Sequence, residues 1–344
     1  MMIDADEKIK ISNSLYSSAD HNVLVDLLTT VKSQGYKFTT VTPRTHDHFL
    51  SKEENAQGSN VQDIFGWNLP FSVDAICPML KQLMFHANII EPRDGLKQSD
   101  GLARSRLRIS SLGPDLFFHS AYPTVEPNAV FFGPDTYRFA RFIQSSLAKD
   151  NRALLSASEQ HKKPLRILDI GCGTGAGGIV TVRALPPRRL YELTMNDINA
   201  DALDLTRVNA QVADVPIHCM QGDIFETLNE KFDLIIANPP YMKDDSGRAY
   251  RDGGENLGLS LSVRIFKTAF EHLSPGGTLL LYTGVAMTSQ SDPFLSIIAP
   301  LLTNENCTWS YEEIDPDVFG EELELPAYST AHRIAAVGLT VTRN

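Results

Sequence analysis

The stretch LRILDIGCGTGAGG, residues 165–178, joins an apolar run to a glycine-rich turn and the beginning of a helical segment. A short apolar run bounded by turn residues is typical of a buried strand. Gly171, Gly173 and Gly175 let the chain turn tightly at the end of that strand and let a ligand approach the backbone closely. The stretch therefore predicts a strand, loop and helix unit with a ligand site at the carboxyl end of the strand.

The same texture continues toward the C-terminus. Strand-like runs alternate with amphipathic segments at 177–185, 200–212 and 259–273, and the runs read LRILDIG, YELTMND, PIHCMQGD, FDLIIANPP and GGTLLLYTG. This alternation predicts an α/β fold with a doubly wound, mostly parallel sheet. The late runs WSYEEI and RIAAVGLTV are expected to form an edge hairpin that closes the sheet.

The first part of the chain has a different organisation. Residues 1–125 are expected to be mainly helical, with helices over 21–35 and 71–90 and a β-hairpin at 107–111 and 116–119 around Gly113. Residues 126–163 read as an extended connector, a helix at 135–147 and a polar linker. The predicted organisation is a separate N-terminal region at 1–125, a connector at 126–163 and an α/β domain at 164–344.

Composition limits the function classes. The net charge is −11, and residues from 160 onward carry 24 acids against 15 bases, which argues against bulk electrostatic binding to duplex nucleic acid. We find no signal-peptide pattern and no apolar run of about eighteen residues, so a soluble, cytoplasmic protein without a membrane partner is expected. The four cysteines form no CxxC pair and have no metal-like spacing to histidine, so no metal site is predicted.

Three acids follow the predicted strands. The glycine loop alone also matches the dinucleotide pattern GxGxxG/A, so a nicotinamide or flavin site is an alternative. Asp169, two residues before the first glycine, favours a cationic amino-acid group over a pyrophosphate, although it can also be a loop cap. Asp197 is placed to accept hydrogen bonds from ribose hydroxyls or to cap the next helix. Asp223 is placed to bind an adenine amino group, with Ile224 packing on the ring, or to be an ordinary turn residue.

Taken together, the order of these elements resembles the Class I methyltransferases over about 180 residues. The resemblance implies a seven-stranded, Rossmann-like sheet and S-adenosyl-L-methionine as the cofactor. It also implies the cofactor-binding residues Asp169, Gly171, Gly173, Gly175, Asp197, Asp223 and Ile224.

The segment FDLIIANPPYM places Asn238, Pro239, Pro240 and Tyr241 just past the fourth strand, beside the expected methyl group. Adjacent prolines stiffen the backbone and have no amide donors, so the Asn238 side-chain oxygen and the Pro239 carbonyl can accept both hydrogens of an NH2 group. Tyr241 is expected to stack on the planar acceptor. These four residues therefore predict N-methylation of a planar amide or amine, by orientation and without a strong general base. The alternative is a proline-rich turn with a buried aromatic residue.

The stretch from Asn238 to the segment SPGGTLLLYTG, with RDGGENLGL at 251–259 between them, looks like the HemK (PrmC) type glutamine methyltransferases. That family methylates the glutamine amide of the GGQ motif in translation release factors, so a protein glutamine is the preferred acceptor. The segment VFFGPDTYRFARFI at 130–143 resembles the part of the family that covers the cofactor, which implies that Thr136 and Phe132 border the ligands. A helix N-cap at Asp135 and core burial of Phe132 are the alternatives. FGPDT stands where the family has a PRPET-like segment, and the N-terminal region, expected to recognise the substrate, differs as well.

Other acceptors stay open at this stage. The motif also serves adenine N6 and guanine N2 of RNA or DNA, and Arg104, Arg106 and Arg108 at the hairpin offer a basic stripe or a solvated strand face. A small-molecule amine is a third candidate, with residues 315–332 shaping its pocket or forming a surface loop. A cofactor-binding interaction protein without turnover is the alternative from another class. The sequence predicts no oligomeric state.

Overall fold

The C-terminal half forms one seven-stranded sheet in the order β11-β12-β10-β9-β6-β7-β8. The computed structural model describes residues 18–92, 101–149, 163–223, 230–243, 250–289 and 291–344. The strands are β6 (Leu165–Ile170), β7 (Tyr191–Asp197), β8 (His218–Gln221), β9 (Phe232–Ala237), β10 (Leu273–Thr288), β11 (Cys307–Asp315) and β12 (Ala331–Arg343). Strand β12 runs antiparallel between β10 and β11, and the remaining neighbours are parallel. The predicted α/β fold and its edge hairpin are confirmed.

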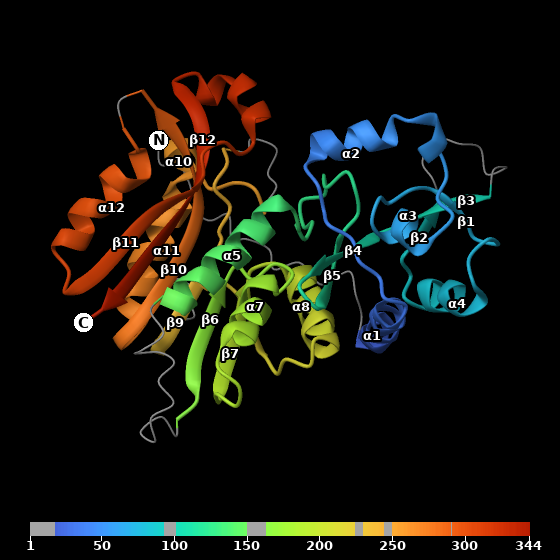
Figure 1. Cartoon of the computed structure of the whole chain (residues 1–344), viewed down its shortest axis with the longest axis horizontal. Coiled ribbons are helices and arrows are strands. Elements are labelled where there is room, and N and C mark those ends of the chain that lie inside the picture. The colour runs from blue at the N-terminus through green and yellow to red at the C-terminus, as the bar shows by residue number, and fades with distance from the viewer. Residues whose placement is uncertain (1–17, 93–100, 150–162, 224–229, 244–249, 290) are drawn as a thin grey trace, which may run out of the picture.

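Helices cover both faces of this sheet (Figure 1). One face packs against α5 (Pro134–Lys149), α7 (Ala176–Ala184) and α8 (Ala200–Val212). The other face packs against α11 (Ser260–His272) and α12 (Pro293–Thr303), and α10 (Glu255–Gly258) precedes α11. Short 3-10 turns at η3 (Gly320–Glu324) and η4 (Pro326–Tyr328) join β11 to β12. The strands β6, β7 and β8 are added outward on one side of β6, and β9 then returns to its other side. The carboxyl ends of β6 and β9 therefore meet at a topological switch point, where open α/β sheets bind ligands.

The N-terminal region has its own core. It contains α1 (Ser18–Ser33), α2 (Pro43–Leu50), η1 (Glu53–Asn55), α3 (Val61–Phe65), α4 (Pro78–His86) and the strands β1 (Phe71–Ser72), β2 (Ile90–Pro92), β3 (Leu102–Ser105), β4 (Leu107–Leu112) and β5 (Asp115–Ser120). The hairpin predicted at 107–119 is confirmed as β4 and β5, with Gly113 in the turn at a φ of 61°. The helix expected over 71–90 is wrong at both ends. Pro78 occupies the first turn of α4, and Asn88 takes a φ of 52° just after it, so only nine residues are helical.

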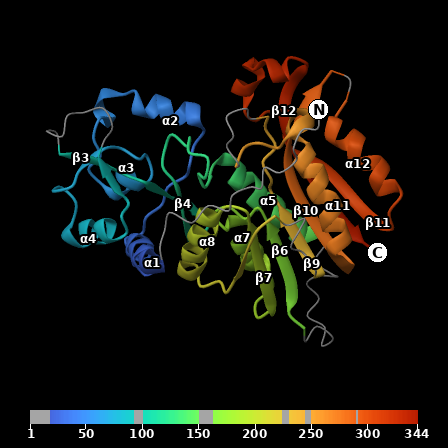
Figure 2. The ribbon, with the colours of Figure 1, turned by 180° about the vertical axis from the view of Figure 1, so that it is seen from behind.

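The N-terminal region docks on α8 through both apolar and polar contacts. Ala202, Leu205 and Val208 of α8 belong to the core cluster of that region. The Asn209 side chain accepts a hydrogen bond from Phe118 N at 2.8 Å and donates to Phe118 O at 3.2 Å. The backbone groups of Phe118 at the edge of β5 thus have a side-chain partner from α8. The two views place α1 beside α8 in agreement with their contacts (Figures 1 and 2). Side chains of α8 thus serve two cores at once.

The three arginines of the hairpin do not form a basic stripe. Arg108 is only 3% exposed, donates from Nε to Gly66 O at 2.9 Å and lies over the Phe38 ring. Arg106 pairs with Glu91 at 3.2 Å. The stripe reading is therefore wrong, because β3 and β4 belong to different sheets and the arginines face different surroundings. In the part of the chain that the structure describes, no helix is both long and apolar enough to cross a membrane.

Candidate active site

Two cavities meet at the carboxyl ends of β6, β7 and β9. The first, called here the large cavity, has a volume of about 260 Å³, and its walls include residues of the glycine loop, the ends of β6 and β7 and the Asn-Pro-Pro segment. The second, called the small cavity, has a volume of about 80 Å³ and lies against the same Asn-Pro-Pro segment. Of the sites expected from sequence, those that line the large cavity are Thr136, Asp169, Gly171, Gly173, Asp197, Asp223, Asn238, Pro239 and Pro240. Ile224 lies outside the described residues.

The glycine loop takes the backbone conformation that its composition permits. Gly171 and Gly173 have φ values of 66° and 55°, and a Cβ at either position would meet no atom within 4 Å. Both residues border the large cavity, so an added Cβ would narrow the space offered to a ligand. Gly175 does not line the cavity. Its φ of 78° precedes the first turn of α7, and a Cβ there would lie 3.0 Å from Thr206 Cγ2, so its place in the motif is conformational.

Asp169 lies below this loop and faces both the protein and the cavity. It is 2% exposed, and one carboxylate oxygen accepts a hydrogen bond from Gly178 N at 2.7 Å. Burial raises the pKa of Asp169 to about 7, and the charge of Asp197 adds to that shift. The residue therefore caps α7, as the structural alternative expected, and also places a carboxylate that a cationic ligand group would keep ionised.

Asp197 at the end of β7 holds the loop from the other side. Its Oδ2 accepts from Gly173 N at 2.9 Å and its Oδ1 accepts from Asn199 N at 2.9 Å. Burial raises the pKa of Asp197, and these hydrogen bonds oppose that shift. Helix α8 is capped by Asn199, whose side chain accepts from Asp201 N. The helix-cap reading of Asp197 is therefore replaced by a role in the loop and cavity wall.

Asp223 completes the far end of the large cavity. Its carboxylate lies 3.6 Å from an Nη atom of Arg264, which comes from α11 and lines the same cavity. Sequence reasoning missed Arg264, because no local pattern relates a residue in the middle of a helix to a strand end 41 positions earlier.

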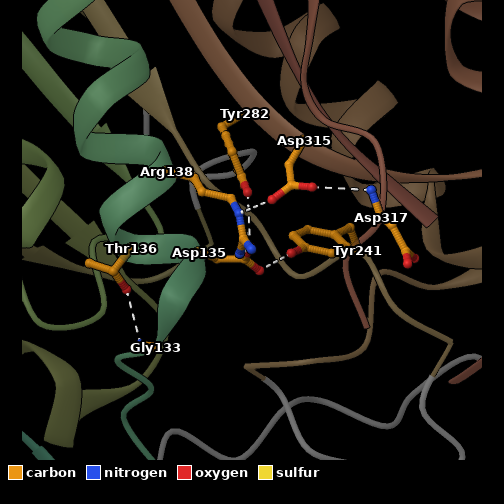
Figure 3. Close-up of polar contacts among 8 residues, drawn as sticks. All are labelled: Gly133, Asp135, Thr136, Arg138, Tyr241, Tyr282, Asp315 and Asp317. Atoms are coloured by element: carbon orange, nitrogen blue, oxygen red, sulfur yellow. Dashed lines mark hydrogen bonds and ion pairs between the residues drawn. The ribbon is translucent and has the colours of Figure 1, made fainter. Parts of the chain in front are cut away.

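The Asn-Pro-Pro segment separates the two cavities, and Tyr241 turns into the small one. Asn238, Pro239 and Pro240 line both cavities, whereas Tyr241 lines only the small cavity and is 7% exposed. The Tyr241 hydroxyl donates to Asp135 (Figure 3). A Cβ on Gly284 would lie 2.2 Å from Tyr241 Cε2, so the Tyr241 ring packs directly against the backbone of β10 at this glycine. The structure thus fixes Tyr241 as a wall of the cavity, held by its hydroxyl.

Asp135 is not a helix N-cap. It lies inside α5 and is 3% exposed. Its Oδ1 accepts from Tyr282 Oη at 2.9 Å and from Arg138 Nη1 at 3.0 Å, while Oδ2 accepts from Tyr241 (Figure 3). Helix α5 begins one residue earlier at Pro134, which suits the first turn and turns Asp135 toward β10.

The DGG segment packs directly on the backbone of Tyr241. A Cβ on Gly253 would lie 2.7 Å from Tyr241 Cα, and one on Gly258 would lie 2.2 Å from Tyr241 O. Gly253 N donates to Met242 O at 2.8 Å, which joins the two segments. The two glycines are therefore required by close approach of the backbones. This gives the DGG segment a physical role beside the Asn-Pro-Pro-Tyr motif.

The connector contributes Phe131 and Thr136. Phe131 lines both cavities and stacks on Tyr250, with ring centroids 5.8 Å apart and an interplanar angle of 8°. Phe132, which was expected to border the ligands, is instead 2% exposed and lines neither cavity; its core alternative is correct because it packs on Phe117. Thr136 Oγ1 accepts from Gly133 N at 3.3 Å.

The sheet order, the glycine loop and the Asn-Pro-Pro-Tyr segment define a Class I S-adenosylmethionine-dependent methyltransferase. The large cavity fits this cofactor because open space above Gly171 and Gly173 admits close backbone approach, and Asp169, Asp197 and Asp223 supply carboxylates at three strand ends. Carboxylates accept hydrogen bonds, so these three side chains are chemically compatible with the ammonium, hydroxyl and amino groups of the cofactor.

The similar sequences agree with this class. The methyltransferase small domain family matches residues 140–291. The chain is 30% identical over 206 residues to a release factor glutamine methyltransferase of Lactococcus lactis, covering 54% of this chain and 72% of that protein. It is 28% identical over 138 residues to ribosomal RNA small subunit methyltransferase C of Serratia proteamaculans, covering 40% of this chain and 36% of that protein. The solved structure of Methanocaldococcus jannaschii Trm5 in complex with adenosine has a TM-score of 0.45 and 14% identity, and covers 70% of this chain and 56% of that one. The chain belongs to the methyltransferase family of the HemK/PrmC type.

Proposed function

We propose that this enzyme methylates the nitrogen of a planar NH2 group and that its preferred acceptor is a protein glutamine side-chain amide. The observation that carries the proposal is the small cavity, which shares the Asn238 and Pro239 wall with the large cavity. The small cavity has a volume of about 80 Å³ and is also lined by the aromatic residues Phe131, Tyr241 and Tyr250. Two oxygen acceptors beside aromatic rings suit the planar NH2 group of a carboxamide.

In this proposal the bound cofactor supplies an electrophilic methyl group attached to a sulfonium sulfur. Asn238 Oδ1 and the Pro239 carbonyl accept hydrogen bonds from the two N–H groups of the substrate. These bonds direct the substrate nitrogen toward the large cavity. Phe131, Tyr241 and Tyr250 surround the amide plane with aromatic rings and exclude water from it. Orientation in a dry site then supplies most of the rate enhancement.

The N-terminal region at 1–125 is proposed to recognise the protein that carries the glutamine, and 126–163 to cover the cofactor. Two observations support this division. The N-terminal region is attached to α8, whose neighbouring loop lines the large cavity, and the connector supplies Phe131 and Thr136 to the cavity walls. The named relatives that methylate release factors make such a factor the first protein to test.

An RNA amine is the second candidate, because ribosomal RNA methyltransferase C proteins are also among the relatives. The burial of Arg108 weighs against it, because this arginine is not available to a phosphate backbone.

The deciding experiment is incubation with labelled S-adenosylmethionine and a lysate that lacks this enzyme, followed by separation of protein, RNA, DNA and small molecules. Purified release factor, and the same factor with its GGQ glutamine replaced by glutamate, are assayed alongside. Label on the factor but not on its glutamate variant supports the proposal. Label confined to RNA overturns the glutamine assignment, and Asn238→Ala is the enzyme control that should give no label in either case.

A further inference from the structure

A buried carboxylate lies in the wall of the small cavity. Among the described residues that line this cavity, Asp135 is the only one with a carboxyl group. Both of its oxygens accept hydrogen bonds, one of them from the hydroxyl of Tyr241, which lines the same cavity (Figure 3). A buried acid beside a catalytic motif, joined to it by a phenol, is an arrangement that can carry a proton.

The proposed reaction requires a proton acceptor. When an NH2 nitrogen takes a methyl group, one N–H proton must leave, whichever planar amine is the substrate. Asn238 carries a neutral amide, and the two prolines present only carbonyl oxygens, so none of the three is a useful base. Because the Tyr241 hydroxyl donates its hydrogen to Asp135, its oxygen keeps lone pairs for a further donor. As the nitrogen takes the methyl group and becomes tetrahedral, one N–H leaves its hydrogen bond at the Asn-Pro wall and donates to this oxygen instead.

We propose that Tyr241 and Asp135 form a proton relay that leads from the acceptor nitrogen to a buried carboxylate. As the nitrogen lone pair forms the N–C bond and the C–S electron pair returns to sulfur, the N–H proton passes to Tyr241 Oη. The hydroxyl proton of Tyr241 passes at the same time to Asp135 Oδ2, which leaves Tyr241 neutral and Asp135 protonated. The relay rests on the proposed N-methylation, but it does not depend on whether a protein or an RNA carries the amine.

The surroundings of Asp135 suit this role. Burial raises the pKa of Asp135, which makes it a stronger base than an exposed carboxylate, and Arg138 and the two tyrosines limit the rise. Burial and the neighbouring Asp135 charge raise the pKa of Tyr241 well above its usual value, so the phenol transfers a proton only as it receives one. Within the described part of the chain, the titratable and charged groups that face Asp135, directly or through Arg138 and the cavity, are Arg138, Tyr241, Tyr282, Asp315, Arg251 and its partner Glu322.

Arg138 is the positioning residue of the relay. It donates to Asp135 Oδ1 at 3.0 Å and from Nε to Asp315 at 2.8 Å, so it ties α5 to the end of β11 (Figure 3). Tyr282 occupies the same oxygen of Asp135 as Arg138 does. Since both act on Oδ1, Oδ2 is left for Tyr241 alone.

The first test measures turnover on the substrate that the wild-type enzyme is found to label. Asp135→Asn and Tyr241→Phe should each lower kcat by about 10²–10⁴-fold, while the Kd for S-adenosylmethionine changes by less than about threefold. The double variant should lose no more than the worse single variant, because the two residues act as one unit. The wild-type kcat should fall at low pH as Asp135 becomes protonated; Asp135→Asn should lack this fall, and Asp135→Glu should restore it. A kcat within twofold of wild type for either single variant overturns the relay.

Asp115→Asn is the matched control. Asp115 is another buried aspartate in an ion pair, with Arg183 at 2.9 Å, and it lines neither cavity. Its substitution should lower thermal stability without changing the pH dependence of kcat. Equal losses of kcat in the Asp115 and Asp135 variants, in proportion to stability, would assign Asp135 a purely structural role.

The second test needs no acceptor. In protein labelled with ¹³C at aspartate carboxyl carbons, the Asp135 signal is assigned by its absence from Asp135→Asn, and its titration is compared in wild type and Tyr241→Phe. Loss of the phenol hydroxyl should shift the titration of Asp135, and an unchanged titration overturns the relay. If the wild type labels no fraction at all, the N-methylation proposal fails and the relay fails with it, whereas the titration then reports only whether the Tyr241 hydroxyl and Asp135 are coupled.

Discussion

The large and the small cavity share the Asn-Pro-Pro wall but are assembled in different ways. Just over half of the residues that line the large cavity lie between 169 and 223, in the loops and helix starts that follow β6, β7 and β8. The small cavity is built from three parts of the chain that are far apart in sequence, within 131–135, within 238–251 and at Phe319. The first is therefore defined by local backbone conformation, whereas the second depends on tertiary packing. The difference predicts that substitutions can abolish transfer and leave cofactor binding intact.

The largest difference between loss of methyl transfer and loss of cofactor binding is expected from Asn238→Ala. This substitution removes the side-chain hydrogen-bond acceptor at the wall that the two cavities share. Loss of one oriented polar group at a transition state costs about 10²–10³-fold in kcat. The Kd for S-adenosylmethionine, measured by calorimetry, should stay within about threefold of wild type. Asn304→Ala, at the exposed end of α12, is the control and should change neither quantity. A kcat close to wild type for Asn238→Ala would remove its catalytic assignment.

A packing change that touches no ligand gives the next largest effect. In Gly284→Ala the new methyl group would lie 2.2 Å from Tyr241 Cε2, so the ring must move and the small cavity changes shape. We expect about a 10²-fold loss of kcat, since misplacement of about 1 Å near the reacting atoms has this cost. Stability should fall by about 1–3 kcal/mol through overpacking, as measured by denaturant unfolding.

Gly320→Ala is the matched control for that substitution. A Cβ at Gly320 would lie 3.7 Å from Asp317 Oδ1, an ordinary contact, although the residue follows directly on Phe319 of the small cavity. Its kcat and stability should stay near wild type. If Gly284→Ala behaves in the same way, the small cavity tolerates movement of Tyr241 and the packing argument fails.

The same difference explains how far sequence alone could reach. Strand alternation and the glycine loop predicted the α/β fold and the wall of the large cavity, because both follow from local pattern. The resemblance implies that Phe132 borders the ligands, with core burial of Phe132 and an N-cap at Asp135 as alternatives. Only the burial of Phe132 is correct, because a shift of one residue along α5 or its connector decides which side chain faces the sheet. Phe131, Arg264 and Phe319 carry no local signal, because each reaches its cavity only through packing of distant segments. The helix expected over 71–90 is shorter in the structure, because the apolar spacing continues past Pro78 and Asn88, where the helix begins and the backbone leaves it.

Asp197→Ala should impair cofactor binding and leave methyl transfer largely intact, which is the reverse of the effect expected for Asn238→Ala. It removes the acceptor of Gly173 N and of any ribose hydroxyl, so both the loop and the ligand lose a charged hydrogen-bond partner. The cofactor Kd should rise by about 10–100-fold, given about 1.5–3 kcal/mol for a hydrogen bond to a charged group. At saturating cofactor the kcat should be nearly restored. Asp197→Asn, which keeps one acceptor oxygen, should have a smaller effect, and calorimetry showing undiminished binding in both variants would remove the ribose role.

The smallest expected effect concerns the pH dependence of the large cavity. The pKa of Asp169 rises from its ordinary 3.8 to about 7 in the folded protein, so between these values the folded state keeps a proton that the unfolded chain has released. The free energy of unfolding of the cofactor-free enzyme should therefore decrease as pH rises from 5 toward 8. A cationic cofactor favours the carboxylate, so its affinity should increase over the same range, by at most about tenfold per pH unit for one proton. Thermal unfolding and calorimetry at pH 6 and pH 8 measure both trends.

Asp169→Asn is the control, because it keeps an oxygen for Gly178 N and removes the titrating charge. The pH dependence of stability and of cofactor affinity should both become flatter in this variant. Unchanged slopes would assign them to another group, such as Asp197, whose pKa is also raised by burial.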